Sequence, residues 1–150
     1  MTFLDDAIER RSVAIATLAG EGTDCFRLVD GWSDGLDGLV VEVFGPVAIF
    51  QEHVGRYAGD DVSLREIAQE VFAHFPAVKS VYRKRFVADR TGAEEEASHR
   101  DATPFAGVPA APVVEARENG HPLMDNRPIV CAIGYFMDIL FYWWCIHQTR

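Results

Sequence analysis

Residues 25–52 read CFRLVDGWSDGLDGLVVEVFGPVAIFQE, and this stretch decides the fold. Three apolar segments of strand length, 25–29, 39–44 and 47–52, are separated by a glycine-rich turn at 30–38 and by Gly45-Pro46. Tight glycine turns between β-branched runs are typical of consecutive antiparallel strands. We therefore expect a β-meander at the centre of the fold.

The residues before this stretch predict a helix. Between residues 3 and 18 the apolar side chains recur at steps of three and four, which is the period of an amphipathic helix. Thr2 can cap its beginning, and Gly20 and Gly22 can end it.

A second helix is predicted after the meander. Ser63 precedes an apolar stripe of helical period, and Glu66 stands three residues later, as in a capping box. Pro76 ends this helix, and a short strand at 80–83 follows.

The remaining segments complete the expected architecture. Residues 91–112 are polar and predict a surface loop or a hairpin insert, whereas 113–118 predict a last strand that ends at Asn119-Gly120. A helix, a meander, a second helix and further strands make an α+β fold, followed by an irregular apolar tail.

Composition and charge restrict the function. The chain has 150 residues, enough for one domain, and carries 14 Lys and Arg against 23 Asp and Glu, for a formal net charge of -9. Phosphate affinity comes from Lys and Arg, so an acidic chain is repelled by nucleic acid overall. Any contact with RNA must therefore come from a local basic patch.

The cysteines predict a reducing, cytoplasmic location. Cys25, Cys131 and Cys145 are odd in number and widely spaced, without a Cys-x-x-Cys motif. The first residues have neither the basic charges nor the apolar stretch of a signal peptide, so secretion is not expected.

The sequence predicts neither a metal site nor a nucleophile. Five histidines are scattered without metal-ligand spacing, and Gly-x-Ser-x-Gly does not occur. The glycine-rich segment 31–38 does not match Gly-x-Gly-x-x-Gly, and a strand is expected after it in place of a helix, so we interpret it as a turn.

One basic run departs from the acidic background. Arg83-Lys84-Arg85 and, further on, Arg90 are interleaved with the aromatic residues Tyr82 and Phe86. Basic residues among aromatic ones can hold phosphates and stack bases, so Arg83, Lys84, Arg85 and Arg90 are candidate RNA-binding residues. The alternative is an ordinary solvated strand end.

Several motifs, in order, resemble the class I SAM-dependent methyltransferases that form 5-methylcytosine in 23S rRNA. They lie in residues 3–120 and are Asp24-Cys-Phe-Arg-Leu-Val, Asp34-Gly-Leu-Asp-Gly-Leu-Val-Val-Glu, Val81-Tyr-Arg-Lys-Arg with Arg90, Pro104-Phe-Ala-Gly, and Val114-Glu-Ala-Arg-Glu-Asn-Gly. The chain departs from this family at Asp37, where proline is usual, and at Val43, where arginine is usual.

The resemblance implies that residues 1–120 are an α+β accessory domain that helps to grip rRNA. In the family a Rossmann-like domain follows, which binds SAM through a glycine-rich loop and carries a nucleophilic cysteine. Neither feature has a counterpart here, so we assign no catalytic, cofactor-binding or metal-binding residue. We expect the chain alone to be inactive, with SAM implied only for the full-length family.

Residues 121–150 form a divergent tail where the SAM-binding domain would begin. Gly134-Tyr-Phe-Met-Asp138 resembles the first half of a family motif, after which the resemblance ends. A truncation, a frameshift or a genuine ending would each explain this. Residues 129–146 are long and apolar enough for a membrane span, but Asp138 near the middle argues against insertion.

Two hypotheses remain open. The chain is either a truncated homologue of an rRNA methyltransferase that retains the RNA-binding accessory domain, or a non-enzymatic interaction module or degraded remnant. In the second case the aromatic tail, with Trp143 and Trp144, would mediate self-association or membrane contact.

Overall fold

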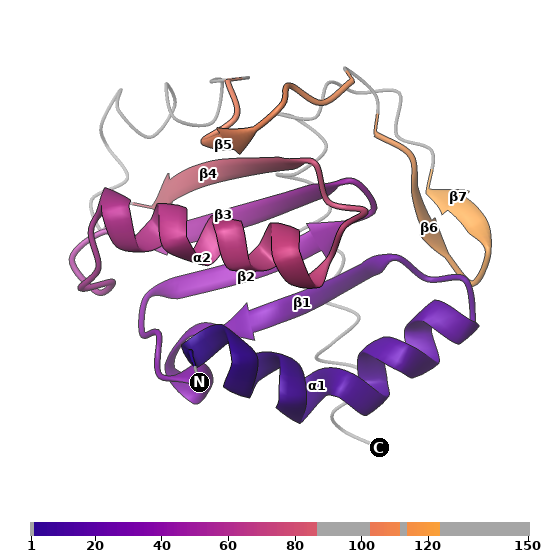
Figure 1. The fold of residues 1–150 in the computed structure, drawn as a ribbon, viewed down its shortest axis with the longest axis horizontal. Coiled ribbons are helices and arrows are strands. Elements are labelled where there is room, and N and C mark those ends of the chain that lie inside the picture. Colours follow the sequence, from indigo (N-terminus) through magenta and orange to yellow (C-terminus); the bar gives the residue numbers. More distant parts are fainter. Residues whose placement is uncertain (1, 87–102, 112–113, 124–150) are drawn as a thin grey trace.

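The computed structural model describes residues 2–86, 103–111 and 114–123 (Figure 1). The polar segment 87–102 and most of the tail lie outside the described residues. The described elements follow the chain in this order: α1 (Phe3–Gly20), β1 (Cys25–Asp30), the 3-10 helix η1 (Gly31–Asp34), β2 (Leu39–Phe44), β3 (Val47–His53), α2 (Asp61–His74), β4 (Ser80–Phe86), β5 (Ala106–Gly107), β6 (Ala116–Glu118) and β7 (His121–Leu123).

Five strands form one sheet in the order β1-β2-β3-β4-β5. The first three pair antiparallel, which confirms the predicted meander. β4 pairs parallel to β3, with Val47 beside Ser80 and His53 beside Phe86. Because parallel neighbours need a crossover, α2 runs back across the sheet between them (Figure 1). The fold is therefore α+β, as predicted.

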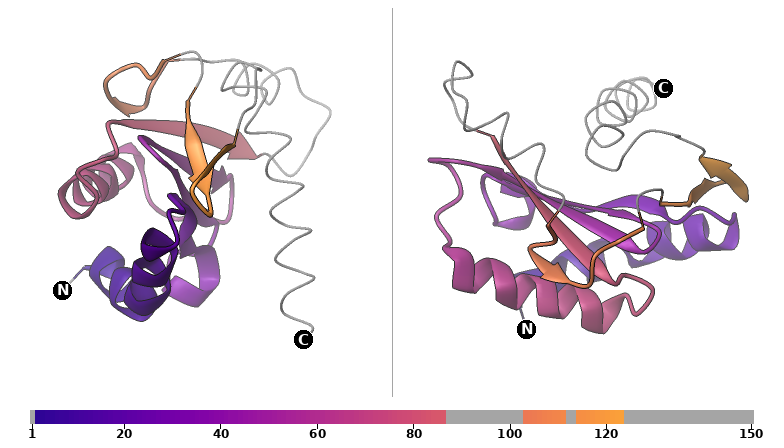
Figure 2. Two further views of the ribbon diagram at one scale, coloured as in Figure 1. Left: turned by 90° about the vertical axis from the view of Figure 1, so that its right-hand side faces the viewer. Right: turned by 90° about the horizontal axis from the view of Figure 1, so that it is seen from above.

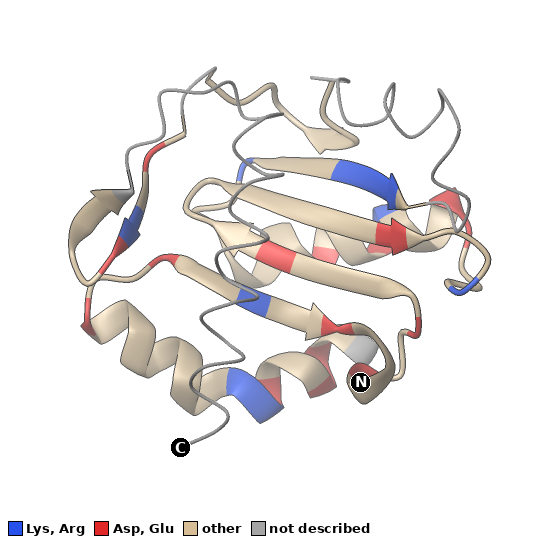
Figure 3. Ribbon diagram, turned by 180° about the vertical axis from the view of Figure 1, so that it is seen from behind, with Lys and Arg blue, Asp and Glu red and all other residues tan. Residues whose placement is uncertain are grey.

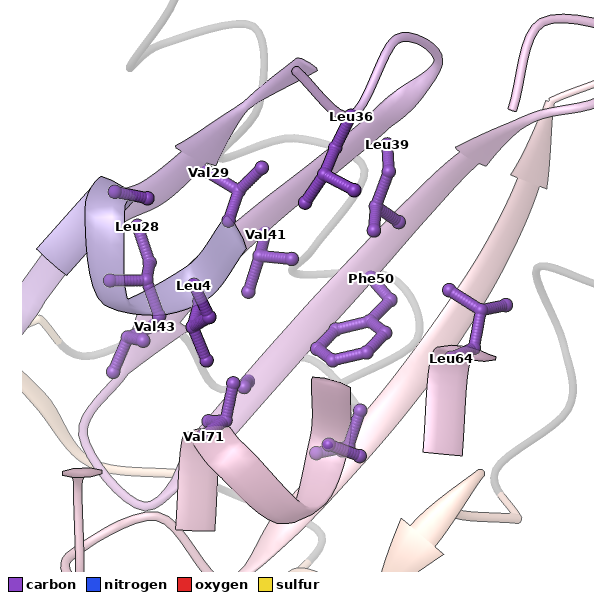
Figure 4. Close-up of a cluster of buried hydrophobic side chains, with 14 of the residues drawn as sticks. Leu4, Leu28, Val29, Leu36, Leu39, Val41, Val43, Phe50, Leu64 and Val71 are labelled. Carbon is purple, nitrogen blue, oxygen red and sulfur yellow. The ribbon is translucent and has the colours of Figure 1, made fainter. Parts of the chain in front are cut away.

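Both helices cover the same face of the sheet, and the hydrophobic core lies between the helices and the strands (Figure 2). Leu4 of α1 and Leu64 and Val71 of α2 point toward the strands, where Val41 and Phe50 meet them (Figure 4). All five are at most 1% exposed. Burying apolar side chains of this size is the main driving force of folding.

Each helix begins at a side-chain cap. The hydroxyl of Thr2 accepts from the backbone N–H of Asp5, and the carboxylate of Asp5 accepts from Thr2 N, as expected for the start of α1. The prediction for α2 was wrong by three residues. Asp60 is the cap, and it accepts from the N–H and the hydroxyl of Ser63. Both are good cap residues, and the extended backbone of Asp60 decides between them.

The turn between β1 and β2 is held by one buried carboxylate. Asp34, whose side chain is 1% exposed, accepts hydrogen bonds from Arg10 Nη2 and Arg11 Nη2, each at 2.7 Å. The backbone N–H of Asp30 donates to it at 2.6 Å. Burial alone would raise the pKa of Asp34, but these hydrogen bonds lower it below its usual value. Asp34 thus joins α1 to the turn.

A small hairpin follows the sheet. β6 and β7 pair antiparallel around Asn119 and Gly120, whose φ values of 51° and 76° suit a two-residue hairpin turn. The predicted strand at 113–118 is shorter in the structure and begins at Ala116. The hairpin is joined to the end of α1 by hydrogen bonds from Gly120 N to Gly22 O and from Asn119 N to Thr23 Oγ1.

We predict that Asp34→Asn lowers the free energy of unfolding by about 1–3 kcal/mol at pH 7, because the two arginines lose their charged partner. The wild type should also lose stability as the pH falls below about 4, since a carboxyl whose folded pKa is depressed stabilises only while it is ionised. Urea unfolding between pH 2 and 7 measures both effects, and the variant should show a weaker acid dependence.

Asp37→Asn is the matched control. Its ion pair with Arg56 is exposed, so its loss should cost no more than about 0.5 kcal/mol. Equal losses in the two variants would contradict the role given to Asp34.

Candidate nucleic-acid interface

Arg83 lies on the helix-covered face of β4, near the end of the sheet where β3 and β4 both terminate. Its Nε donates to Glu52 Oε2 at 2.7 Å, and its Nη1 donates to Asp61 Oδ1 at 2.7 Å. Burial disfavours the charge of Arg83, but the hydrogen bonds with both carboxylates raise its pKa above the ordinary value. The guanidinium is therefore a permanent cation that joins β3 to the first turn of α2.

An aromatic ring lies beside this cation. The ring centroid of Phe105 is 5.4 Å from Cζ of Arg83 and 4.7 Å from Cζ of Arg65, in α2. Arg65 also donates to the carbonyl of Phe105 at 3.2 Å. Cation–π contacts of this kind stabilise a guanidinium over a ring while its N–H groups remain directed at other acceptors. Arg65 is exposed, so it can meet a ligand.

Arg85 extends the cluster along β4. Its side chain is 52% exposed, and its Nε lies 3.5 Å from Glu52 Oε2. Glu52 contacts both Arg83 and Arg85, and Asp61 contacts Arg83, whereas Arg65 contacts Phe105. We call the three arginines, together with Phe105, the arginine cluster. It brings three guanidinium groups and an aromatic ring together on an acidic chain.

The four residues expected to bind RNA are divided by the geometry of the strand. Arg83 and Arg85 share a face because side chains alternate along β4. Lys84 belongs to the opposite face and is 6% exposed. Arg90 lies outside the described residues. Sequence reasoning missed Arg65 and Phe105, which are 40 residues apart and carry no motif that links them.

A buried polar network occupies the sheet face that is turned away from the helices, where acidic and basic residues lie on neighbouring strands (Figure 3). Glu42 accepts from Arg27 Nε at 3.1 Å and from Gln51 Nε2 at 2.8 Å. Lys84 is the register partner of Gln51. The buried carboxylate is thus hydrogen-bonded on both oxygens, as stability requires. Lys84 therefore belongs to the same buried polar network as Glu42 and Gln51.

A cavity of about 730 Å³ lies between the beginnings of the two helices and the turn after β3. Its lining includes the apolar Leu4 and Ile67, one cation, Arg56, and four carboxylates, those of Asp6, Asp37, Glu66 and Glu70. The excess of carboxylates repels phosphate, so this cavity does not suit a nucleotide. Within the described ranges no group of three or more His, Cys, Asp or Glu could hold a metal ion.

The described residues do not fit a methyl-transfer site. The glycine-rich segment 31–38 forms η1 and a turn between two antiparallel strands, as predicted, whereas a SAM loop joins a strand to a helix. Burial, followed by the neighbouring carboxylate of Asp24, raises the pKa of the Cys25 thiol to about 12. A thiol with that pKa is a poor nucleophile at neutral pH because little thiolate is present.

Comparisons with known proteins identify the fold. Neither a protein family nor a curated protein sequence matches this chain. A candidate methyltransferase solved in complex with SAH has a TM-score of 0.54 at 16% identity. A candidate SAM-dependent methyltransferase from Streptococcus mutans has a TM-score of 0.52 at 17% identity. Both matches cover 80% of this chain but only 27% of the other, so the chain spans about a quarter of these proteins.

The membrane hypothesis for the tail concerns residues outside the described part. Among the helices of the described part, none combines the length and the apolar character of a membrane span.

We predict that Cys25 reacts with a thiol-alkylating reagent at pH 8 on the order of a hundredfold more slowly in the folded protein than in the unfolded one, because its thiolate is scarce. A variant with Cys131→Ser and Cys145→Ser isolates the reaction. Mass spectrometry of the labelled chain in buffer and in urea gives the two rates, and equal rates would contradict the buried, protonated thiol.

Proposed function

We propose that this chain is the RNA-binding accessory part of a SAM-dependent rRNA methyltransferase of the 5-methylcytosine type. Two independent facts support the proposal. The ordered motifs in residues 3–120 resemble that family, and the fold matches about a quarter of two candidate methyltransferases. The chemistry of methyl transfer would then reside in a SAM-binding domain that is not among these 150 residues, and the protein would act in the reducing cytoplasm.

The observation that carries the proposal is the arginine cluster. A chain with a formal net charge of -9 gains affinity for phosphate only where cations gather locally. Here Arg65 and Arg83 flank Phe105, and Arg85 extends the same surface toward solvent. Guanidinium groups beside an aromatic ring bind single-stranded RNA through phosphate contacts and stacking.

The direct test is a titration of the full chain with fragments of large-subunit rRNA at about 50 and 200 mM salt, with radiolabelled SAM present. We expect binding that weakens steeply with salt and no transfer of label to the RNA. Absence of binding at the lower salt would contradict the proposal and favour an interaction module or a remnant. Transfer of label by this chain alone would contradict its accessory role.

The cluster itself is tested by single neutralisations. We predict that Arg65→Gln and Arg85→Gln each weaken RNA binding several-fold at low salt and reduce the salt slope by about 0.7, the value for one lost phosphate contact on single-stranded nucleic acid. Filter binding or fluorescence anisotropy over a salt series measures both. Arg83 is unsuitable for this test, because its ion pairs also hold β3 to α2.

Arg117→Gln is the matched control. Its side chain is 54% exposed and, among the described residues, forms an ion pair with the nearby Glu115. β6 lies beside the start of β1, so it is at the other end of the strands from the arginine cluster. If this control weakened binding as much as Arg85→Gln, the affinity would depend on overall charge and not on the cluster.

A further inference from the structure

Trp32 is the most exposed large apolar side chain of the described residues, at 81%. It lies in η1, the short 3-10 turn between β1 and β2. Indole rings are normally buried because their apolar area is large, and a tryptophan held in water is a common centre of binding surfaces. Its neighbour Leu36 turns into the core instead. The exposure of Trp32 therefore contributes nothing to folding and calls for another explanation.

The turn that carries Trp32 is pre-organised. The backbone N–H of Gly35 donates to Trp32 O at 3.2 Å, and Leu36 N donates to Gly31 O at 3.0 Å. Gly31 and Gly35 have φ values of 55° and 75°, which favour glycine. With Asp34 held by two arginines of α1, the backbone of this turn is fixed, and the indole is exposed to solvent. A rigid platform loses little entropy when it binds a ligand.

One cationic side chain at this turn suits an anionic ligand. Two guanidinium groups, from Arg10 and Arg11, contact the single carboxylate of Asp34. Arg10 remains 50% exposed, so part of its hydrogen-bonding capacity faces solvent. An exposed aromatic ring and a half-exposed arginine on two elements in contact, η1 and α1, are groups that can bind an unpaired base and its phosphate.

The pairing of the strands places this turn and the arginine cluster at the same end of the strands. Asp30, at the end of β1, pairs with Val40 at the start of β2, and Leu39 beside it pairs with Glu52 near the end of β3. Glu52 in turn pairs with Arg85 of β4. The ends of β1 and β4 are three strand spacings apart, about 14 Å. The acidic cavity lies between the two positions, so the turn and the arginine cluster would contact separate parts of a bound RNA.

We propose that Trp32 is a stacking platform for an unpaired nucleobase of RNA, with Arg10 holding the adjacent phosphate. This inference rests on the proposed RNA binding but uses different residues, and it names the ligand class: single-stranded rather than duplex RNA. A base that is paired inside a helix has no free face for the indole, whereas the arginine cluster needs only phosphates.

The test compares Trp32→Ala, Trp32→Phe and the wild type for binding to a single-stranded rRNA fragment and to its duplex. We expect Trp32→Ala to weaken binding of the single strand at least about fivefold, the lower end of one base–aromatic stack. Trp32→Phe should restore most of the affinity, and duplex binding should change less than twofold. Val13→Ala, which removes another exposed apolar side chain at 79%, is the matched control and should bind like the wild type.

The outcomes separate this inference from the proposed function. If the wild type binds no RNA, the proposed function itself fails. If the wild type binds and Arg85→Gln weakens binding while Trp32→Ala does not, only the stacking platform is overturned. Loss of self-association in sedimentation without loss of RNA affinity would show that Trp32 contacts protein, which also overturns it. Urea unfolding of Trp32→Ala should match the wild type, since the side chain is exposed.

Discussion

The parallel pairing of β3 with β4 is the constraint on which the rest of the structure depends. Two strands that run the same way cannot be joined by a tight turn, so the chain must cross the sheet, and α2 makes that crossing. The crossing brings the apolar stripe of α2 onto the core and its first turn onto the end of β4. Asp61 and Glu52 reach the same guanidinium for this reason. Core packing and the arginine cluster are consequences of one pairing.

Part of the acidic composition stabilises the fold. Asp34, Glu42 and Glu52 are all buried, and each accepts hydrogen bonds from one or more arginines of another element. These carboxylates join secondary-structure elements and do not contribute to repulsion at the surface. The pairing is necessary because an unpaired buried charge would destabilise the fold. The formal charge therefore says little about any single face of the molecule.

Local periodicity was sufficient to predict both helices, the meander and the class of fold, because each depends on residues close in sequence. The direction of β4 was not predictable in the same way, since it depends on contacts between residues about 30 apart. For the candidate site, the period of two along a strand already separates Lys84 from Arg83 and Arg85. Arg65 and Phe105 meet only through the fold, and the exposure of Trp32 cannot be read from a turn sequence.

The outer side of β4 has a further consequence. Among the described strands, β5 is only two residues long and pairs with Ser80 and Val81 alone. Arg83 and Arg85 lie on one face of the rest of β4, and positive side chains near the margin of a sheet discourage the addition of a strand from another molecule. The arginines proposed to contact RNA thus also help to protect a β-branched, apolar sheet from edge-to-edge aggregation. Selection for solubility alone would retain some of them.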